Sequence, residues 1–524
     1  MISNLSVSGL LESVCAKSPT SEAAYDGYQR ISYQQLWKDS INLASSLKTI
    51  GVEKGDKVAV CLPNSNEFVV ISMAVAHLGA ILVPFNTRYR LDEVKYILRN
   101  SESKVAFLTN GVKDVNHYEQ FTVAKEEIAS LETLITVRCE INGLLSYQSM
   151  VDNHNNSEFT PVKIDPENDI FSILYTSGST GSPKGAMLTH ANVVRTAIKS
   201  AEKMECTSKD VFLVAVPAFH VFGMVPSILS SIVVGARMVL MGEYKPKAAL
   251  EIIESEQITI KNGVPTMFIL ELNHYEFANY DLSSLRTGII AAAPCPVEIV
   301  KRIRQDMGCD IVVAYGLSET SPNLTMTSFE DDDVIRAETV GKPLPGAEVK
   351  IFNSNREEVA CGEVGEIVCR SFGVMKGYYN MPEKTLEAID AEGWLSTGDL
   401  GTLDKQGNLR IVGRMKEMII RGGYNIYPRE IEEILYTNPA VLEVAIVGLP
   451  DTVLGEISCA CVKIKPNFVV NAQDLTNYIK PRVADYKVPD KLLIMEEFPM
   501  TASGKIRKIS LQEQVQEILE KELR

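Results

Sequence analysis

The sequence lacks an excess of basic residues. Its 52 Lys and Arg stand against 67 Asp and Glu, which gives a formal net charge of −15. Nucleic-acid binding needs a basic face, so this balance argues against a nucleic-acid partner. Small anionic ligands stay compatible with the charge, because a local pocket can oppose the net charge of the chain.

The ten cysteines include no C-x-x-C pair and therefore form no recognisable zinc or disulfide framework. Reduced thiols in an intracellular, cytoplasmic protein fit this pattern best. The first basic residue is Lys17, so we expect no secretory signal. Residues 211–236 carry no charge and are long enough to span a bilayer, but Pro217, Gly223 and Pro226 interrupt them. We predict buried core beside a pocket there, and at most peripheral membrane contact.

No internal repeat or low-complexity tract divides the 524 residues, a length that suits about two to four domains. The first part of the chain alternates apolar strand-like runs with helical runs, as in residues 57–63, 66–80 and 80–86. Strands separated by helices at this spacing indicate parallel βαβ units. The length fits two doubly wound sheets, in which ligands bind at the carboxyl ends of the strands.

The pattern of predicted elements changes near residue 340. From there on, short strand-like runs alternate with predicted turns that contain Gly, Pro and Asn. This indicates a small antiparallel, barrel-like β unit. A compact α+β segment follows Gly413 without a long flexible linker. We therefore predict an α/β protein with a large N-terminal domain, made of two doubly wound sheets and the β unit, and a smaller α+β C-terminal domain.

The sequence also lacks a Walker loop, because Gly178 lies six residues before Lys184 and a glycine follows the lysine. Nevertheless, the run YTSGSTGSPKG at residues 175–185 lies between an apolar run and a predicted helix that begins at about His190. Glycines permit close backbone approach, hydroxyl and N–H groups donate to phosphate oxygens, and Lys184 adds a positive charge. We read the segment as a strand, a phosphate-binding loop and a helix, with a Ser/Gly linker as the alternative.

This loop resembles the signature of the adenylate-forming superfamily, which comprises acyl- and aryl-CoA synthetases, peptide-synthetase adenylation domains and beetle luciferases. Further motifs of that superfamily follow in order down the chain. They are PAFHVFGM (217–224), AAAP (291–294), YGLSET (315–320), GWLSTGD (393–399), GRMKE (413–417), GGYNIYP (422–428) and SGK (503–505). Each motif alone is weak, whereas the ordered set is highly specific.

The resemblance implies an enzyme that joins a carboxylic acid to AMP, releases pyrophosphate, and then transfers the acyl group to CoA. Lys505 would bridge carboxylate and phosphate, Thr320 would donate to the α-phosphate, and Glu319 would bind Mg²⁺. His220 would gate the approach of the thiol. A solvated lysine and a buried core histidine are the ordinary alternatives for Lys505 and His220.

The resemblance further implies a set of residues for ATP, CoA and Mg²⁺. Tyr315 would lie against adenine, Asp399 would accept from the ribose hydroxyls, and Thr176 would join Glu319 at the metal. A core aromatic and a turn Asp are the alternatives for Tyr315 and Asp399. The full binding set is Thr176, Ser177, Gly178, Ser179, Thr180, Gly181, Lys184, Ala292, Ala293, Pro294, Tyr315, Gly316, Asp399, Arg414, Lys416 and Gly423.

The two half-reactions need different surroundings, and the superfamily meets this need by rotating its C-terminal domain. Carried over to this chain, residues 1–413 form the catalytic domain and residues 417–524 a mobile lid, with a hinge at 414–416. Lys416 is the hinge residue, and Gly423 would let the pantetheine arm pass the backbone.

The acid pocket should be lined by residues 217–224, 263–268, 288–294 and 315–324, which are mostly apolar. These segments include Phe222, Met224, Met267 and Phe268. Their character favours a fatty or aromatic acid over a charged one. The run GLSETSPNLTMT resembles medium- and long-chain fatty acyl-CoA synthetases more than aryl ligases, which implies a medium- or long-chain fatty acid. An aryl acid is the alternative substrate.

The sequence shows no insertion of the kind that restrains the lid in fatty acyl-AMP ligases, so CoA is preferred as the acceptor. Loading of an acyl or peptidyl carrier protein is one alternative. A non-catalytic nucleotide- or acyl-binding relative is another, although Lys505, Glu319 and Asp399 are all present. The sequence leaves open whether the protein is a monomer or a homodimer.

Overall fold

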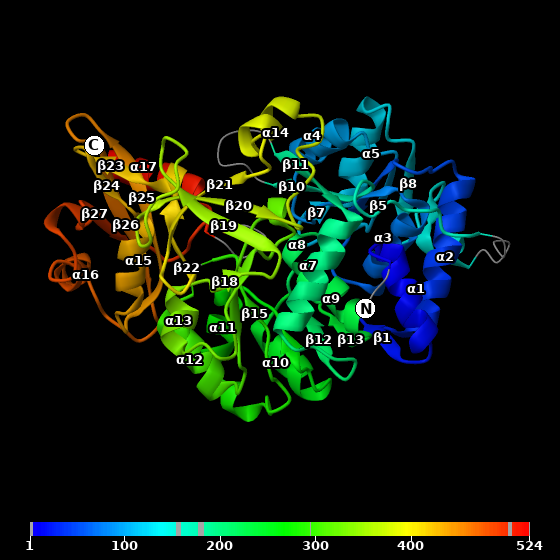
Figure 1. Cartoon of the computed structure of the whole chain (residues 1–524), viewed down its shortest axis with the longest axis horizontal. Coiled ribbons are helices and arrows are strands. Elements are labelled where there is room, and N and C mark those ends of the chain that lie inside the picture. The colour runs from blue at the N-terminus through cyan, green and yellow to red at the C-terminus, as the bar shows by residue number, and fades with distance from the viewer. Residues whose placement is uncertain (1–3, 153–158, 177–182, 294, 501–505, 523–524) are drawn as a thin grey trace.

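The computed structural model describes residues 4–152, 159–176, 183–293, 295–500 and 506–522. Along its longest axis the chain runs from an N-terminal part, through a central part, to a C-terminal part at the opposite end (Figure 1). Among the described residues, no helix is long and apolar enough to cross a membrane.

A seven-stranded sheet forms the N-terminal part, in the order β11-β10-β4-β3-β5-β8-β9. All its neighbouring strands are parallel except β10 and β11. This agrees with the βαβ units predicted from the sequence. Its strands are β3 (Lys57–Cys61), β4 (Ile81–Pro84), β5 (Val105–Leu108), β8 (Thr133–Thr136), β9 (Leu145–Ser146), β10 (Ile170–Thr176) and β11 (Lys184–Thr189).

A second sheet forms the central part, in the order β14-β12-β13-β1-β2. Parallel bridges from Ile260 to Thr287 and from Gly263 to Ile290 continue it into the order β15-β16-β17-β18. Its strands are β1 (Glu22–Tyr25), β2 (Arg30–Ser32), β12 (Val211–Val214), β13 (Arg237–Leu240), β14 (Ile260–Lys261), β15 (Ile289–Ile290), β16 (Val312–Tyr315), β17 (Thr325–Met326) and β18 (Lys342–Pro343).

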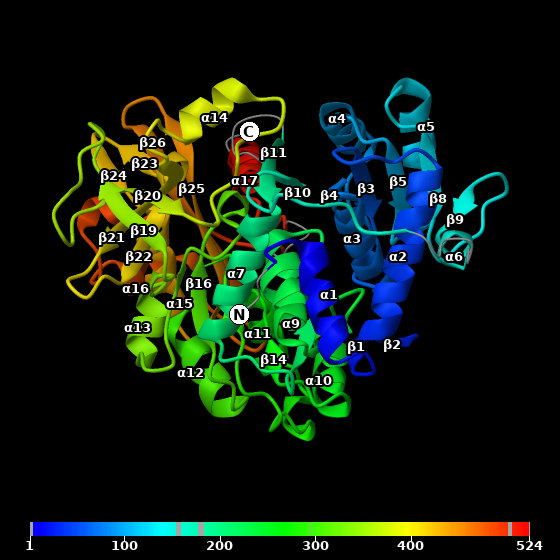
Figure 2. The ribbon, with the colours of Figure 1, turned by 45° about the vertical axis from the view of Figure 1, so that its right-hand side comes forward.

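Helices cover both faces of these sheets, which is the doubly wound arrangement. One buried cluster contains residues of both sheets together with helices that lie between them (Figure 2). Two further clusters of buried hydrophobic residues pack against the outer faces of the two sheets, one on the central sheet and one on the seven-stranded sheet. The helices are α1 (Val7–Lys17), α2 (Tyr33–Thr49), α3 (Asn66–Leu78), α4 (Leu91–Ser101), α5 (His117–Glu127), α6 (Tyr147–Val151), α7 (His190–Lys203), α10 (Pro246–Ser255), α11 (Pro265–Leu272), α12 (Val297–Asp306), α13 (Asp333–Glu338) and α14 (Pro382–Ala388).

The uncharged run 211–236 folds as a strand, a loop and short helices in the buried core, as predicted. After β12 and a loop it forms α8 (Val221–Gly223), a π-helix η1 (Met224–Leu229) and α9 (Ser230–Val234). Every residue of η1 is buried. The short minor elements elsewhere are β6 (Gly111–Val112), β7 (Val115–Asn116), η2 (Phe277–Asn279), η3 (Ser318–Thr320), η4 (Met415–Glu417) and η5 (Asp485–Lys487).

The expected antiparallel unit is a four-stranded sheet of β19 (Ala347–Phe352), β20 (Gly365–Ser371), β21 (Leu395–Leu403) and β22 (Leu409–Arg414). A separate α+β unit follows it. That unit contains β23 (Ile419–Arg421), β24 (Tyr424–Ile426), α15 (Pro428–Tyr436), β25 (Val441–Asp451), β26 (Gly455–Ile464), α16 (Ala472–Ile479), β27 (Lys491–Ile494) and α17 (Lys508–Glu522), with its own buried clusters.

One strand was not predicted. Residues Lys184–Thr189, between the glycine-rich run and the helix, form β11, which runs antiparallel to β10. Helix α7 begins at His190, as expected, where Thr189 and Asn192 form a capping box. The strands β10 and β11 are therefore antiparallel neighbours, and the helix start lies six residues beyond Lys184.

Candidate active site

The β10–β11 hairpin brings two predicted site residues together. Thr176 and Lys184 are partners in the strand register, and the Thr176 hydroxyl donates to the Lys184 carbonyl at 3.4 Å. The other predicted loop residues, Ser177, Gly178, Ser179, Thr180 and Gly181, lie outside the described residues.

Tyr378 links this hairpin to the predicted metal ligand. Its hydroxyl donates to Glu319 Oε1 at 2.8 Å, and the Lys184 ammonium lies 4.5 Å from the centroid of its ring. An ammonium held against an aromatic face is attracted by the ring quadrupole. Lys184 and Glu319, which sequence reasoning placed in one site, therefore contact the ring face and the hydroxyl of a single tyrosine.

The segment at residues 373–379 is fastened between β11 and η3 by its backbone. On the β11 side, Met187 N donates to Gly377 O at 2.9 Å, and Tyr379 N donates to Gly185 O at 2.8 Å. On the η3 side, Met375 N donates to Glu319 O at 2.8 Å. The position of Tyr378 thus follows from main-chain hydrogen bonds on both sides of it.

The turn that carries Thr320 is closely packed. Thr320 is fully buried, and its hydroxyl accepts from Leu317 N at 2.8 Å within its own turn. A Cβ at Gly316 would lie 1.5 Å from the Pro322 carbonyl oxygen, so a side chain there would displace the turn. Gly316 therefore has a packing role in addition to the binding role predicted from the sequence.

Tyr315 and Asp399, the residues predicted at adenine and ribose, contact each other. The Tyr315 hydroxyl donates to Asp399 Oδ2 at 2.7 Å, and Arg414 Nε lies 3.2 Å from Asp399 Oδ1. Asp399 and Arg414 are also partners across β21 and β22. Burial, followed by the charge of Asp399, raises the pKa of Tyr315 well above its usual value. Tyr315 therefore stays a donor.

The segment after β15 presents exposed backbone in a strained conformation. Ala292 and Ala293 are exposed, and Ala292 has a φ of +75°, in the left-handed region that residues with a Cβ rarely occupy. Such strain concentrates at binding sites. Pro294, the third predicted residue of this segment, lies outside the described residues.

The segments predicted to line the acid pocket meet at the ends of the central strands. Gly263 N donates to Ile289 O at 2.9 Å, and the Asn262 amide joins Pro226 O to Ile289 N. Phe222, Met224, Val264, Met267, Ala291 and Leu324 belong to one buried cluster. Phe268 does not join them. It packs in the cluster on the other face of the sheet, against Lys261.

His220 lies at the start of α8, with its ring centroid 4.8 Å from that of Phe219. Asn64 holds the chain leading to it, because its amide donates to Val214 O and its carbonyl oxygen accepts from Ala218 N. A Cβ at Gly223 would lie 2.3 Å from the Pro217 carbonyl oxygen. The loop around His220 is therefore tightly constrained.

The predicted hinge lies between two sheets. Lys416 is exposed within η4, which joins β22 to β23. The neighbouring Glu417 lies 3.0 Å from Lys508 at the start of α17. Gly423 lies in the turn between β23 and β24, where a Cβ would meet no described atom within 4 Å.

Lys505 lies outside the described residues, but the chain on both sides of it is described. Met500 and Ile506 form an antiparallel bridge, and Arg507 N donates to Pro499 O at 2.7 Å. Burial and Glu93 raise the pKa of Tyr89 to about 12, while the charge of Arg507 opposes this shift. Arg507 therefore lies near the N-terminal part of the chain.

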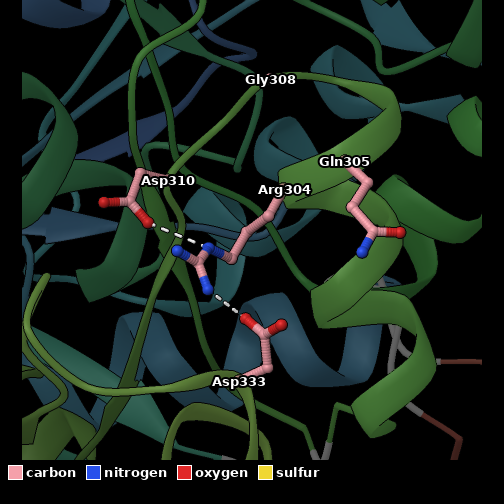
Figure 3. Close-up of a pocket in the computed structure, with 5 residues that line it drawn as sticks. All are labelled: Arg304, Gln305, Gly308, Asp310 and Asp333. Atoms are coloured by element: carbon pink, nitrogen blue, oxygen red, sulfur yellow. Dashed lines mark hydrogen bonds and ion pairs between the residues drawn. The ribbon is translucent and has the colours of Figure 1, made fainter.

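A cavity of about 370 Å³ at the end of α12 lies apart from these motifs. It is lined by Arg304, Gln305, Gly308, Asp310 and Asp333 (Figure 3). Arg304 pairs with both Asp310 and Asp333, so its charge is already offset and unsuited to capture a phosphate. Among the described residues, no group of three His, Cys, Asp or Glu side chains is placed to hold a metal.

Sequence reasoning missed three residues that organise the site. Asn64 and Asn262 form hydrogen bonds with backbone atoms of other segments. Any residue type can supply those backbone atoms, so no sequence motif marks the role of the two asparagines. Tyr378 lies in the run KGYYN, where paired aromatics after a glycine were the available signal.

Comparison with known proteins identifies the family of the chain. Residues 11–379 match the model of the AMP-binding enzymes, and residues 430–505 match that of the AMP-binding enzyme C-terminal domain. The chain is 39% identical to the putative acyl-CoA synthetase YngI of Bacillus subtilis (strain 168), over 97% of both chains. It is 34% identical to the mitochondrial medium-chain acyl-CoA ligase ACSF2 of Macaca fascicularis, over 97% of this chain and 86% of that protein.

The solved structure of the anthranilate CoA ligase AuaEII in complex with anthranoyl-AMP superposes on the chain with a TM-score of 0.90. The two are 26% identical, and 97% of each chain is covered. Because a family model covers more than half of the sequence and the predicted motifs meet in space, the chain belongs to the AMP-binding enzymes, the adenylate-forming superfamily.

Proposed function

We propose that this AMP-forming acid:CoA ligase activates a medium-chain fatty acid, with ATP and Mg²⁺ as the co-reactant and metal. The observation that carries the choice of acid is the buried apolar cluster shared by the pocket segments, which contains Phe222, Met224 and Met267. An apolar slot of this kind favours an aliphatic chain over a charged acid. A relative named as a medium-chain acyl-CoA ligase supports the same choice.

In the first half-reaction a carboxylate oxygen of the acid attacks the α-phosphorus of ATP. A new O–P bond forms, the bond between the α-phosphorus and the bridging oxygen breaks, and pyrophosphate leaves. Both reactants are anions, so their repulsion must be offset. Lys505 would bridge carboxylate and phosphate, and Lys184 adds a second positive charge from β11.

The nucleotide would be held by Tyr315 and Asp399. One Asp399 oxygen accepts from Tyr315 and the other faces Arg414, so the carboxylate is oriented before the ribose arrives. A carboxylate can accept about four hydrogen bonds, which suits two ribose hydroxyls in addition to these contacts. The exposed backbone at Ala292 and Ala293 would border the adenine, with Pro294.

The type of ligand present fits Mg²⁺, because the Glu319 carboxylate is a hard oxygen donor. It lies close to Lys184 of β11, since both residues contact Tyr378. When bound, Mg²⁺ would offset phosphate charge, and Thr176 would join Glu319 there. Donation from Thr320 to the α-phosphate requires its hydroxyl to exchange the bonds it makes within its own turn.

In the second half-reaction the CoA thiolate attacks the acyl carbon, a C–S bond forms, and AMP leaves with the electron pair of the broken C–O bond. We propose that residues 417–524 rotate about 414–416 between the steps, with Lys416 as hinge. Gly423 would then face the pantetheine arm, and His220 would gate its entry. Loading of a carrier protein stays the alternative to CoA, the choice between monomer and homodimer stays open, and a cytoplasmic location stays a prediction.

A panel of acids tests this proposal. Straight-chain acids from acetate to palmitate, together with benzoate, are compared by kcat/KM for pyrophosphate release with CoA present. We expect a maximum near eight to twelve carbons, because each buried CH₂ contributes about 0.8 kcal/mol until the slot is full. A maximum at benzoate, or at acetate, would overturn the choice of acid.

A further inference from the structure

The relationship between Lys184, Tyr378 and Glu319 goes beyond the residues that the motifs assign. Tyr378 is buried, and its hydroxyl reaches Glu319 Oε1 at 2.8 Å while its ring face lies 4.5 Å from the Lys184 ammonium. It therefore contacts both charged groups at once, with its edge toward the anion and its face toward the cation.

The hydrogen bond has a fixed direction. An ionised carboxylate has no proton to donate, so the Tyr378 hydroxyl donates and Glu319 Oε1 accepts. A phenol donor orients a carboxylate without neutralising it. One donor also occupies only one of about four acceptor positions of the carboxylate, and the others stay available to a ligand.

Lys184 and Glu319 both contact Tyr378, and among the described residues no ion pair joins one to the other. A lysine and a glutamate in direct contact would form an ion pair, and each would then be less available to an incoming phosphate or metal. Lys184 instead lies on an aromatic face, which attracts the ammonium while leaving its N–H donors available.

We propose that Tyr378 is a positioning residue for MgATP: it orients Glu319 toward the metal and keeps Lys184 from pairing with that carboxylate. This proposal rests on the proposed function of the site. The main-chain hydrogen bonds at residues 375, 377 and 379 fix the tyrosine independently of any ligand, so the arrangement exists before ATP binds.

The neighbouring Tyr379 provides a matched control. Its hydroxyl donates to Glu102 at 2.9 Å on the surface, and its link to the hairpin is through its backbone N–H. Tyr378→Phe removes one hydroxyl at the site, and Tyr379→Phe removes one hydroxyl beside it. Tyr378→Leu removes the ring as well, which tests the separation of the two charges.

The experiment measures binding of ATP to the full-length protein by calorimetry, without acid or CoA, with and without Mg²⁺. We expect Tyr378→Phe to weaken MgATP binding about 10-fold, which is about 1.4 kcal/mol, because a hydrogen bond to a charged group is lost. Binding of metal-free ATP should stay within about 2-fold of wild type. Tyr379→Phe should leave both affinities unchanged, and Tyr378→Leu should weaken both.

Equal MgATP affinity in Tyr378→Phe and wild type would overturn the proposal, as would equal losses with and without Mg²⁺ in Tyr378→Phe. The Mg²⁺ concentration for half-maximal ATP–pyrophosphate exchange gives a second readout, which should rise in Tyr378→Phe and not in Tyr379→Phe. Failure of the proposed function is a separate result: wild-type protein would bind MgATP but show no acid-dependent exchange.

Discussion

The hydroxyl of Tyr315 donates a 2.7 Å hydrogen bond to Asp399 Oδ2, which joins the end of β16 in the central sheet to β21 in the antiparallel unit. These two residues are 84 positions apart in the sequence. Their contact brings the predicted adenine and ribose sites together, and it holds a buried carboxylate in place without any ligand.

Loss of the Tyr315 hydroxyl tests this contact. Tyr315→Phe keeps the ring for adenine but leaves Asp399 with one donor fewer. We expect the KM for ATP to rise about 10- to 150-fold with a smaller change in kcat, because a hydrogen bond to a charged group contributes about 1.5–3 kcal/mol. Steady-state kinetics at saturating acid and CoA measure the effect. A KM for ATP equal to that of wild type would show that the contact does not support nucleotide binding.

Loss of Lys505 should separate the two half-reactions. Lys505→Ala is expected to lower acyl-adenylate formation about 10²–10³-fold, because a charge that stabilises the transition state is removed. Thioester formation from supplied acyl-AMP should stay within a few-fold of wild type. Lys521→Ala, at an exposed position of α17, is the control and should change neither rate. Equal loss of both half-reactions would contradict a role confined to the first.

The buried pair of Lys261 and Glu271 should matter for stability. Both side chains are fully buried and lie 2.9 Å apart, and Tyr244 donates to Glu271 at 3.0 Å. Lys261→Met leaves a buried carboxylate without its partner, which should cost about 3–5 kcal/mol in the free energy of unfolding.

The double variant Lys261→Met with Glu271→Leu should recover most of that loss, because it removes both charges together. Urea midpoints for the wild type, both single variants and the double variant measure the effect. If the double variant were less stable than Lys261→Met, the pair would not be the cause of the loss.

Two buried histidines make stability depend on pH. Burial lowers the pKa of His77 to about 3 and that of His190 to about 4. The unfolded chain takes up protons near pH 6.5, so stability is complete above that pH and falls as the pH drops toward the folded-state values. Each histidine should contribute a loss of about 2 kcal/mol between pH 8 and pH 5.

Urea midpoints across this pH range test the prediction in wild type and in His77→Gln. The variant should lose about 2 kcal/mol less than wild type between pH 8 and pH 5, because glutamine does not titrate. An identical pH dependence in the two proteins would contradict the assignment to His77.

Much of the fold could be predicted from residue patterns. Within the run KVAVCLP, residues Lys57–Cys61 form β3, and the buried helix α3 follows, as expected. Both elements could be predicted because a short apolar run is typical of a buried strand and a longer one of a buried helix. The segment KGAMLT was harder. It follows a glycine-rich run of the sequence, and its strand character comes from pairing with β10, a tertiary contact that local patterns do not encode.

The site residues likewise divide into those that local sequence patterns predict and those that depend on tertiary contacts. Tyr315, Glu319 and Asp399 could be named as candidates from motifs, because the motifs that the chain shares with the superfamily carry those residue types in that order. Tyr378 and the pair of Lys261 with Glu271 could not, because their significance depends on which side chains meet across elements. Phe268 was placed in the acid pocket because its sequence neighbours lie there, but its position on α11 turns it to the other face.

The most direct test of the two-step account follows the purified wild-type protein with octanoate, ATP, Mg²⁺ and labelled pyrophosphate. Without CoA, we predict octanoate-dependent exchange of label into ATP. With CoA, mass spectrometry should find octanoyl-CoA and AMP in equal amounts. Octanoate-dependent exchange that gives no thioester after CoA is added would contradict the account and favour a carrier protein as the acceptor.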